Sequence, residues 1–463
     1  MSAIAAVVGV DEGVLMRRPP FFGLVVAGLL AVSACSNGGL GGSGLSTTGS
    51  PSMASSTQVS ATPEPSTASR VPASVAVPSS ASSGSIQPAP LSAAATPPTV
   101  WPTPAADHLV AAPTAGLLAD PRCPGVRCVT IAMAGDVLLH PQLIAQARAD
   151  AGDDSDSTVD GMDFFPMLAA QQKYVAGADI GICHLETPLA DPDGPFENYP
   201  AFSVPPQVLP ALTRTGFDAC STASNHTIDQ GTTGLNRTLD DLDAAGILHD
   251  GSYRSQADTR VPVVINTPHG RVGFISVAYG FNGSEPDEPW QVNTIDIDAI
   301  KARAHLARAA GADLVVVAMH AGEEYDHTPN LEQKDTATAL LADPDIDLVY
   351  GHHAHVVQPM EKINGKWAIY GLGNDIAAQL GSAPGVQQGL LVRVQFSRDA
   401  AGTWTTSDVG WVASYQDVGA PYRWCALTST DTCGTGSGTA LAETTQVVNR
   451  WGADTDGAHR LDS

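Results

Sequence analysis

Short apolar runs of strand length recur along the chain, and most of them are rich in β-branched residues. They span residues 129–134, 180–183, 217–222, 271–277, 313–319, 346–350 and 367–370. Helical patterns of apolar residues lie between several runs, over about 232–246, 297–310 and 331–341, the first with Thr232 or Thr233 as its N-cap and Gly246 at its end. This alternation predicts an α/β fold, in which helices pack on a mostly parallel sheet.

Polar side chains follow these runs repeatedly. Asp136 follows the first run, Glu186 the second, and the pair Asn225 and His226 the third; His320 and the pair His353 and His355 follow two later runs. Ligands of α/β proteins bind beyond the carboxyl ends of the strands, so we expect these side chains to converge. Each one taken alone is typical of a helix cap, a turn or a solvated surface.

The residue types indicate a metal site. Oxygen and imidazole ligands without thiolate suit divalent Mn, Fe, Zn or Mg, and two such ions need a shared carboxylate. His353 and His355 are two residues apart, and in an extended segment their imidazoles would point the same way. The pattern therefore predicts a divalent-metal centre.

Five motifs carry a family resemblance when they are taken in order. They read GDVLLH, HLETPLA, ASNHTIDQGTTGL, MHAGEEY and GHHAHVVQPME, with AIYGLGN after them. The series resembles the CapA-type poly-γ-glutamate capsule biosynthesis family, which is related to the calcineurin-like metallophosphoesterases, over residues 129–396. The resemblance implies a metallophosphoesterase-like sandwich of β-sheets flanked by α-helices, with the metal centre at the strand ends.

The resemblance also implies roles for individual residues. Asp136 and His355 would bind the first metal, and Glu186 would take the bridging position. Asn225, His320 and His353 would bind the second metal. His226 would protonate a leaving oxygen and Asp229 would orient it. The chain departs from the metallophosphoesterase pattern at Glu186, where that pattern has Asp, and at His140, which is four residues from Asp136 instead of two. Glu323, Glu324 and His352 are expected to be solvated or to lie behind the ligands.

The N-terminal segment has the features of an export signal. Arg17 and Arg18 precede an apolar stretch over residues 21–32, and the stretch ends at Val-Ser-Ala-Cys35, which resembles a bacterial lipobox. We expect residues 1–35 to be a lipoprotein signal peptide with Cys35 as the lipidation site. An ordinary signal peptide with an incidental cysteine is the alternative.

Composition divides the remainder of the chain. Residues 36–121 are rich in Ser, Thr, Ala and Pro and predict a disordered tether, because they cannot bury enough apolar surface to fold. Residues 122–433 are predicted to form the folded domain, and residues 434–463 a polar tail that frays. Within the domain, the stretch after about Thr403 is either a small accessory β-unit or an extension of the main sheet.

The charge balance excludes some functions. The 23 Lys and Arg residues against 48 Asp and Glu residues give a net charge of −25, most of it in residues 122–463. Nucleic-acid binding depends on clustered basic residues, which the chain lacks, and no apolar run is long enough to cross a bilayer. Some of the carboxylates are expected to bind cations.

Six cysteines remain once Cys35 is assigned to the lipid. The pairs Cys123 with Cys128 and Cys425 with Cys433 lie in loop-like sequence and are expected to form disulfides, as suits an exported protein. Cys183 and Cys220 lie in apolar runs. We expect them to be buried thiols, with a third bridge as the alternative.

The sequence supports more than one function. We expect a lipid-anchored, extracytoplasmic protein of poly-γ-glutamate or capsule biosynthesis that carries two divalent ions and acts as a metal-dependent hydrolase. One alternative is a surface metal-dependent phosphoesterase. Another is a non-catalytic scaffold or anchor of a membrane polymer-synthesis complex. The expected partners are the membrane and an anionic polymer or phosphoester, and not nucleic acid.

Overall fold

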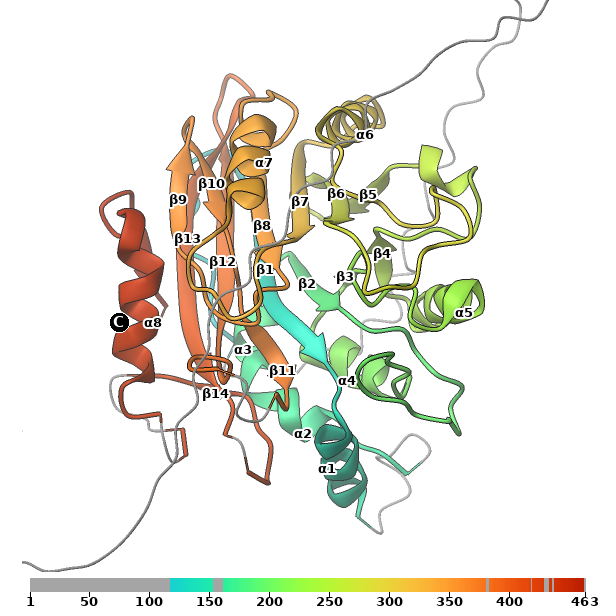
Figure 1. Ribbon diagram of the computed structural model, residues 1–463. Coiled ribbons are helices and arrows are strands. Elements are labelled where there is room, and N and C mark those ends of the chain that lie inside the picture. The colour runs from blue at the N-terminus through green and yellow to red at the C-terminus, as the bar shows by residue number, and fades with distance from the viewer. Residues whose placement is uncertain are drawn as a thin grey trace, which may run out of the picture. The chain divides into compact units, whose positions relative to one another are not determined.

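The computed structural model describes residues 117–152, 161–379, 383–417, 419–428, 433–434 and 437–461, all of which belong to one compact unit (Figure 1). The predicted signal peptide, Cys35 and nearly all of the predicted tether lie outside the described residues. Among the helices in the described ranges, none has the length and apolar character needed to cross a membrane.

The first sheet is mixed, with strand order β14-β13-β12-β1-β2-β3-β4. β1 to β4 run parallel to one another, whereas β12, β13 and β14 are antiparallel to their neighbours. β11 pairs with the end of β1, and β15 pairs with β13. Its strands are β1 (Arg127–Leu138), β2 (Ile180–Leu185), β3 (Ala219–Ser221), β4 (Leu248–Asp250), β11 (Asn374–Ala377), β12 (Gln388–Arg398), β13 (Trp404–Tyr415), β14 (Cys425–Ala426) and β15 (Ala458–Arg460).

The second sheet has the order β5-β6-β7-β8-β10-β9. Its four central strands are parallel, and the two edge strands are antiparallel to their neighbours. The strands are β5 (Val263–Asn266), β6 (Arg271–Ala278), β7 (Leu314–His320), β8 (Leu348–His352), β9 (Met360–Ile363) and β10 (Lys366–Ile369). Each sheet therefore has a parallel centre, and the antiparallel strands were not part of the prediction.

Helices cover the outer faces of the two sheets, which pack against each other. Ile131 of β1 and Val316 of β7 belong to the apolar core between the sheets. A second core joins the first sheet to α1–α5, and a third joins the second sheet to α6 and α7 (Figure 1). The helices are α1 (Pro141–Ala151), α2 (Phe165–Leu168), α3 (Gln172–Val175), α4 (Val208–Thr215), α5 (Gly231–Ala244), α6 (Ile297–Ala309), α7 (Leu331–Leu341) and α8 (Ala440–Val448). The expected sandwich of β-sheets flanked by α-helices is confirmed.

Four aspartates stand directly before parallel strands and fix their starts. The side chain of each accepts a hydrogen bond from a backbone N–H of the neighbouring strand. The bonds are Thr130 N to Asp179 at 2.9 Å, Gly181 N to Asp218 at 2.8 Å, Arg271 N to Asp313 at 3.0 Å and Val315 N to Asp347 at 2.7 Å. Some of the acidic residues of the domain therefore stabilise the sheets and are not available as metal ligands.

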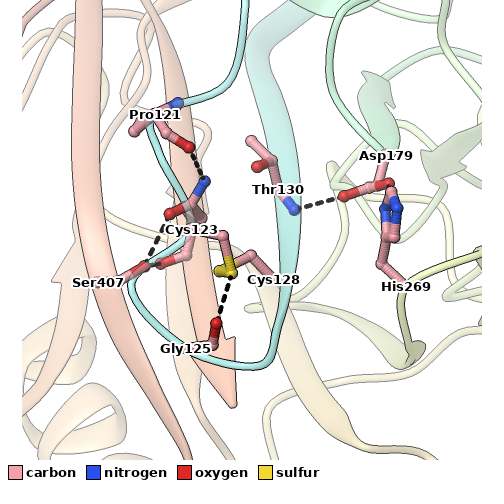
Figure 2. Close-up of a disulfide and its surroundings, with 9 residues drawn as sticks. Pro121, Cys123, Gly125, Cys128, Thr130, Asp179, His269 and Ser407 are labelled. Atoms are coloured by element: carbon pink, nitrogen blue, oxygen red, sulfur yellow. Dashed lines mark hydrogen bonds and ion pairs between the residues drawn. A yellow bond between two sulfur atoms is a disulfide. The ribbon is translucent and has the colours of Figure 1, made fainter. Parts of the chain in front are cut away.

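The folded domain begins earlier than predicted. The N–H of Leu118 donates to the carbonyl of Lys173 at 2.7 Å, and Arg393 binds Asp120. Gln395 donates to the carbonyl of Pro121 at 2.9 Å, beside the Cys123–Cys128 disulfide that leads into β1 (Figure 2). Residues 118–121 are therefore fixed to the domain and are not part of a tether.

The two expected disulfides, Cys123–Cys128 and Cys425–Cys433, are present. The expectation of two free buried thiols is wrong, because Cys183 and Cys220 form a third disulfide. The register of the parallel strands β2 and β3 places these two residues side by side, with their Cα atoms 4.5 Å apart. Sequence periodicity does not reveal this register.

The prediction of a frayed C-terminal tail is also wrong. Residues 440–448 form α8, and Val448, with no exposed surface, packs in the core between the sheets. β15 adds to the first sheet beside β13. The stretch after Thr403 extends the main sheet, since β13 pairs along its length with β12. Trp404, Trp411 and Tyr415 all belong to it.

Candidate metal centre

The six predicted metal ligands come together where the two sheets meet. Asp136 lies on β1, Glu186 follows β2 and Asn225 follows β3 of the first sheet; His320 ends β7, and His353 and His355 follow β8 of the second sheet. All six are at least 96% buried. The six side chains therefore converge at the strand ends, as expected. Their roles as metal ligands remain a proposal.

Asp136 connects the two sheets through two histidines. Its Oδ1 lies 2.9 Å from Nδ1 of His352, and its Oδ2 lies 3.1 Å from Nδ1 of His355. Burial would raise the pKa of Asp136, but hydrogen bonds and positive charge from the two histidines hold this pKa well below its ordinary value. Gly135 lets β1 lie close to the backbone of Gly373, whose carbonyl accepts from the N–H of Asp136 at 2.9 Å, because a Cβ at Gly135 would lie 2.1 Å from that oxygen. Asp136 is therefore a carboxylate anion at neutral pH.

Glu186 is buried, and few contacts replace the water that its carboxylate loses. It is 1% exposed, and among the described residues neither of its carboxylate oxygens has a hydrogen-bond partner. Its ion-pair partner is His355, whose Nε2 lies 3.6 Å from Oε1. Burial raises the pKa of Glu186 to about 7. The pKa of His355 is lowered by burial but raised more strongly by Glu186 and Asp136, to about 9. A carboxylate without hydrogen bonds is stable in the interior only with a cation or a proton.

The second half of the site is built from neutral imidazoles. Nε2 of His320 lies 2.9 Å from Oδ1 of Asn225, and the rings of His320 and His353 are 4.7 Å apart. Burial and neighbouring histidines lower the pKa of His320 well below its ordinary value and that of His353 to about 3. The neutral ring is the form of histidine that binds metals.

The backbone at the two histidines after β8 is strained. His353 has φ of 85° and His355 has φ of 54°, in the left-handed region that favours glycine. β8 ends at His352, so the expectation of an extended His353–His355 segment is wrong. Their rings nevertheless lie 6.1 Å apart. Strained non-glycine residues of this kind cluster at functional sites.

The chemistry of the donor set fits a divalent cation. Besides both carboxylate oxygens of Glu186, the site has four buried polar atoms that lack a hydrogen-bond partner within the described ranges: Asp136 Oδ2, Asn225 Nδ2, His352 Nε2 and His353 Nδ1. Two groups of three side chains place ligand atoms within 4.8 Å of one another. They are Asp136 with His184 and His352, and Asp136 with Glu186 and His355.

Two further histidines of this site are not among the six predicted ligands. His352, expected to be solvated or to lie behind the ligands, is 1% exposed and bonds directly to the predicted ligand Asp136, so it takes the second of these positions. His184, with no exposed surface, stacks on His352 with ring centroids 4.1 Å apart. A usable signal was present, since His184 precedes Glu186 by two residues and the GHHAH motif contains a third histidine. Nδ1 of His140 lies 3.0 Å from the carbonyl oxygen of Leu138, and its ring packs edge-on against Phe202 at 5.8 Å.

His226 and Asp229, the predicted catalytic pair, form a close contact beside the centre. Nδ1 of His226 lies 2.7 Å from Oδ2 of Asp229, within a turn in which Asp229 N donates to His226 O. The ring of Phe202 packs edge-on against His226 at 4.8 Å. Nε2 of His226 lies 3.3 Å from Nδ2 of Asn282. Asp229 thus fixes the orientation of the ring, and a role of the pair in proton transfer remains a proposal.

Comparison with known proteins identifies the family. A family model described as bacterial capsule synthesis protein PGA_cap matches residues 130–379, which is more than half of the chain. The chain belongs to this family. The resemblance to CapA-type capsule proteins is thereby confirmed, and the matched PGA_cap region contains every residue of the candidate centre.

Three curated relatives of this PGA_cap protein are named for PGA, capsule or polyglutamine synthesis. The PGA biosynthesis protein CapA of Bacillus subtilis is 31% identical over 176 residues, which cover 36% of this chain and 44% of that protein. The capsule biosynthesis protein CapA of Bacillus anthracis is 28% identical over 178 residues, covering 37% and 43%. A probable polyglutamine synthesis accessory protein of Mycobacterium tuberculosis is 30% identical over 211 residues, covering 42% and 55%. The chain spans about half the length of the curated relatives it matches.

Two solved structures show a weak likeness. The NAD nucleotidase of Haemophilus influenzae aligns with a TM-score of 0.37 at 11% identity, covering 71% of this chain and 61% of that one. A sulfate thiohydrolase, SoxB, of Thermus thermophilus aligns with a TM-score of 0.34 at 13% identity, covering 66% and 58%. These values are too low to bear on the site.

Proposed function

We propose that this protein is a lipid-anchored, extracytoplasmic component of poly-γ-glutamate or related capsule synthesis that carries a divalent-metal centre. The family and the names of the relatives support the capsule role. The observation that carries the metal centre is Glu186, whose carboxylate is buried at the meeting point of two sheets with no hydrogen bond from the described residues. The lipobox-like sequence at Cys35 supports the anchor.

The side chains divide into two sets around Glu186. Asp136 and His355 would hold one ion, and Asn225, His320 and His353 would hold a second, with Glu186 between them. Divalent ions at such a site supply Lewis acidity and make water a nucleophile near neutral pH. Mn, Fe, Zn and Mg all suit these oxygen and imidazole ligands.

His226 supplies the proton in this proposal. Asp229 accepts its Nδ1–H, so Nε2 can hold a proton and give it to a leaving oxygen. Asn282 is exposed and contacts Nε2, so a substrate can replace it there. This arrangement supports hydrolysis of a phosphoester or of an envelope polymer.

A scaffold role is the second candidate, and one observation favours it. His355 lies between Asp136 and Glu186, and with its pKa raised to about 9 it neutralises part of their charge without a metal. The cluster would then be a buried ion-pair network that holds the two sheets together.

Polymer output separates the two roles. In polymer-producing cells that carry the full chain, the hydrolase proposal predicts that His226→Ala lowers output roughly 10²-fold or more. The exposed His305→Ala serves as the matched control and should leave output unchanged. If His226→Ala leaves output intact while Cys35→Ala abolishes it, the protein is an anchor or scaffold. Screening model phosphoesters with added Mn²⁺ tests the phosphoesterase alternative.

A further inference from the structure

Four buried side chains, two of them predicted metal ligands, form a continuous row of polar contacts at the candidate centre. Oγ of Ser221 lies 2.8 Å from Nδ1 of His184, and Nε2 of His184 lies 2.9 Å from Nδ1 of His320. Nε2 of His320 lies 2.9 Å from Oδ1 of Asn225. All four residues are at most 1% exposed. Strand pairing places Ser221 of β3 directly beside His184 of β2.

One backbone carbonyl sets the direction of this row. Oγ of Ser221 also lies 3.3 Å from the carbonyl oxygen of Cys183, which can only accept. A hydroxyl has one hydrogen, so both contacts are satisfied only if Ser221 donates to Cys183 and accepts from Nδ1–H of His184. His184 then accepts at Nε2 from Nδ1–H of His320. The proton positions of both imidazoles follow from this single fixed acceptor.

The direction of these hydrogen bonds determines which nitrogen of His320 carries the proton and which faces Asn225. With its proton on Nδ1, His320 presents an unprotonated Nε2 to Oδ1 of Asn225, so two acceptors face each other at 2.9 Å. Nδ2 of Asn225 finds no hydrogen-bond partner among the residues that the structure describes. Two facing acceptors repel each other unless a cation binds both, or the Asn225 amide turns by about 180° so that Nδ2 donates to Nε2. Both cases leave the proton of His320 on Nδ1.

We propose that His184 is a positioning residue that holds the unprotonated Nε2 of His320 toward the metal centre. The contact of His184 with His352, at 4.1 Å and an interplanar angle of 16°, also places it against the residue that bonds to Asp136. His184 therefore supports both halves of the site without being one of its six predicted ligands. This inference rests on the proposed metal centre.

Two measurements on the full chain test the proposal. In the metal-free protein, ¹⁵N NMR of labelled histidines should show His320 as the Nδ1–H tautomer, with its signals assigned by their loss in His320→Gln. Zn²⁺ affinity, measured by competition with a chromogenic chelator, should fall about 10–100-fold in His184→Ala, as for other partners of metal-binding histidines. Ser221→Ala changes the side-chain volume little, and we expect it to weaken Zn²⁺ binding as well.

The matched control is Thr187→Val, which removes a buried hydroxyl that makes no hydrogen bond within the described part of the chain. It should bind Zn²⁺ like the unmodified protein. A predominant Nε2–H tautomer of His320 in the unmodified protein would overturn the proposal. So would unchanged Zn²⁺ affinity in both His184→Ala and Ser221→Ala. A chain that binds none of Zn²⁺, Mn²⁺, Fe²⁺ and Mg²⁺ refutes the metal centre itself, and the tautomer still decides the direction of the row.

Discussion

Nδ1 of His352 lies 2.9 Å from Oδ1 of Asp136, although 216 residues separate the two in the sequence. Asp136 belongs to the first sheet and His352 to the second, so the contact joins the sheets at the candidate centre. Both side chains are at most 1% exposed. The residues that would bind metal therefore also contribute to the stability of the fold.

Asp136→Ala should destabilise the metal-free protein strongly. The substitution leaves His352 and the positively charged His355 buried without their carboxylate partner. Removing one member of a buried ion pair costs about 3–5 kcal/mol. Urea unfolding of the full chain with EDTA present measures the change. The exposed Asp335→Ala on α7 is the control and should stay within about 0.5 kcal/mol of the unmodified protein. Equal effects of the two substitutions would show that Asp136 is not needed to join the sheets.

Asp229→Asn should impair proton transfer and leave metal binding unchanged. Oδ2 of Asp229 accepts both from His226 and, at 2.7 Å, from the backbone N–H of Phe202. The amide is similar in size but has no charge to hold the imidazole in its orientation. Polymer output should fall at least tenfold, with the metal content per chain unchanged. Loss of metal together with output would place Asp229 in the structure of the centre instead.

Local patterns predicted much of the fold. Every predicted apolar run overlaps a strand, and α6 and α7 lie within one residue of their predicted bounds. Such elements follow from periodicity within a short window. The predicted N-cap of α5 is wrong, because the helix begins at Gly231 after Gln230, whose side chain makes no capping bond.

The features that were not predicted from the sequence depend on contacts between distant segments of the chain. α8 is short and flanked by polar residues, and it is held by contacts with the core between the sheets. The Cys183–Cys220 disulfide depends on strand register. His352 joins the site because β8 ends opposite β1, a relation between two sheets that no local pattern contains.

Val448→Ala tests the packing of α8. Val448 has no exposed surface, so we expect the substitution to destabilise the protein by about 1–3 kcal/mol through lost burial and an internal cavity. Val126→Ala is the matched control, because Val126 is 68% exposed and should change stability little. The free energy of unfolding in urea gives both values. If the two variants are alike, α8 does not stay docked in solution.

Asp375 predicts a pH dependence of stability. It is 3% exposed, and burial raises its pKa to about 7 from 3.8, although Gln171 donates to it. The folded state therefore binds a proton that the unfolded state releases above pH 4. This contribution to stability is present below about pH 4 and is lost as the pH rises to about 7.

Asp375→Asn should remove this dependence. The neutral amide imitates the protonated acid, so the variant should be more stable than the unmodified protein at pH 8 by a few kcal/mol, and similar to it near pH 4. Melting temperatures across this range measure the effect. A variant that is less stable at pH 8 would mean that the charged carboxylate is the favoured form.

Metal analysis of the purified full chain tests the central claim most directly. Inductively coupled plasma mass spectrometry after reconstitution with Mn²⁺, Fe²⁺, Zn²⁺ or Mg²⁺ should find one to two ions of at least one of these metals per chain. The double variant Asp136→Ala with His353→Ala should bind none, while His305→Ala binds as the unmodified protein does. A chain that stays metal-free with all four ions, or a double variant that keeps its metal, would contradict the account.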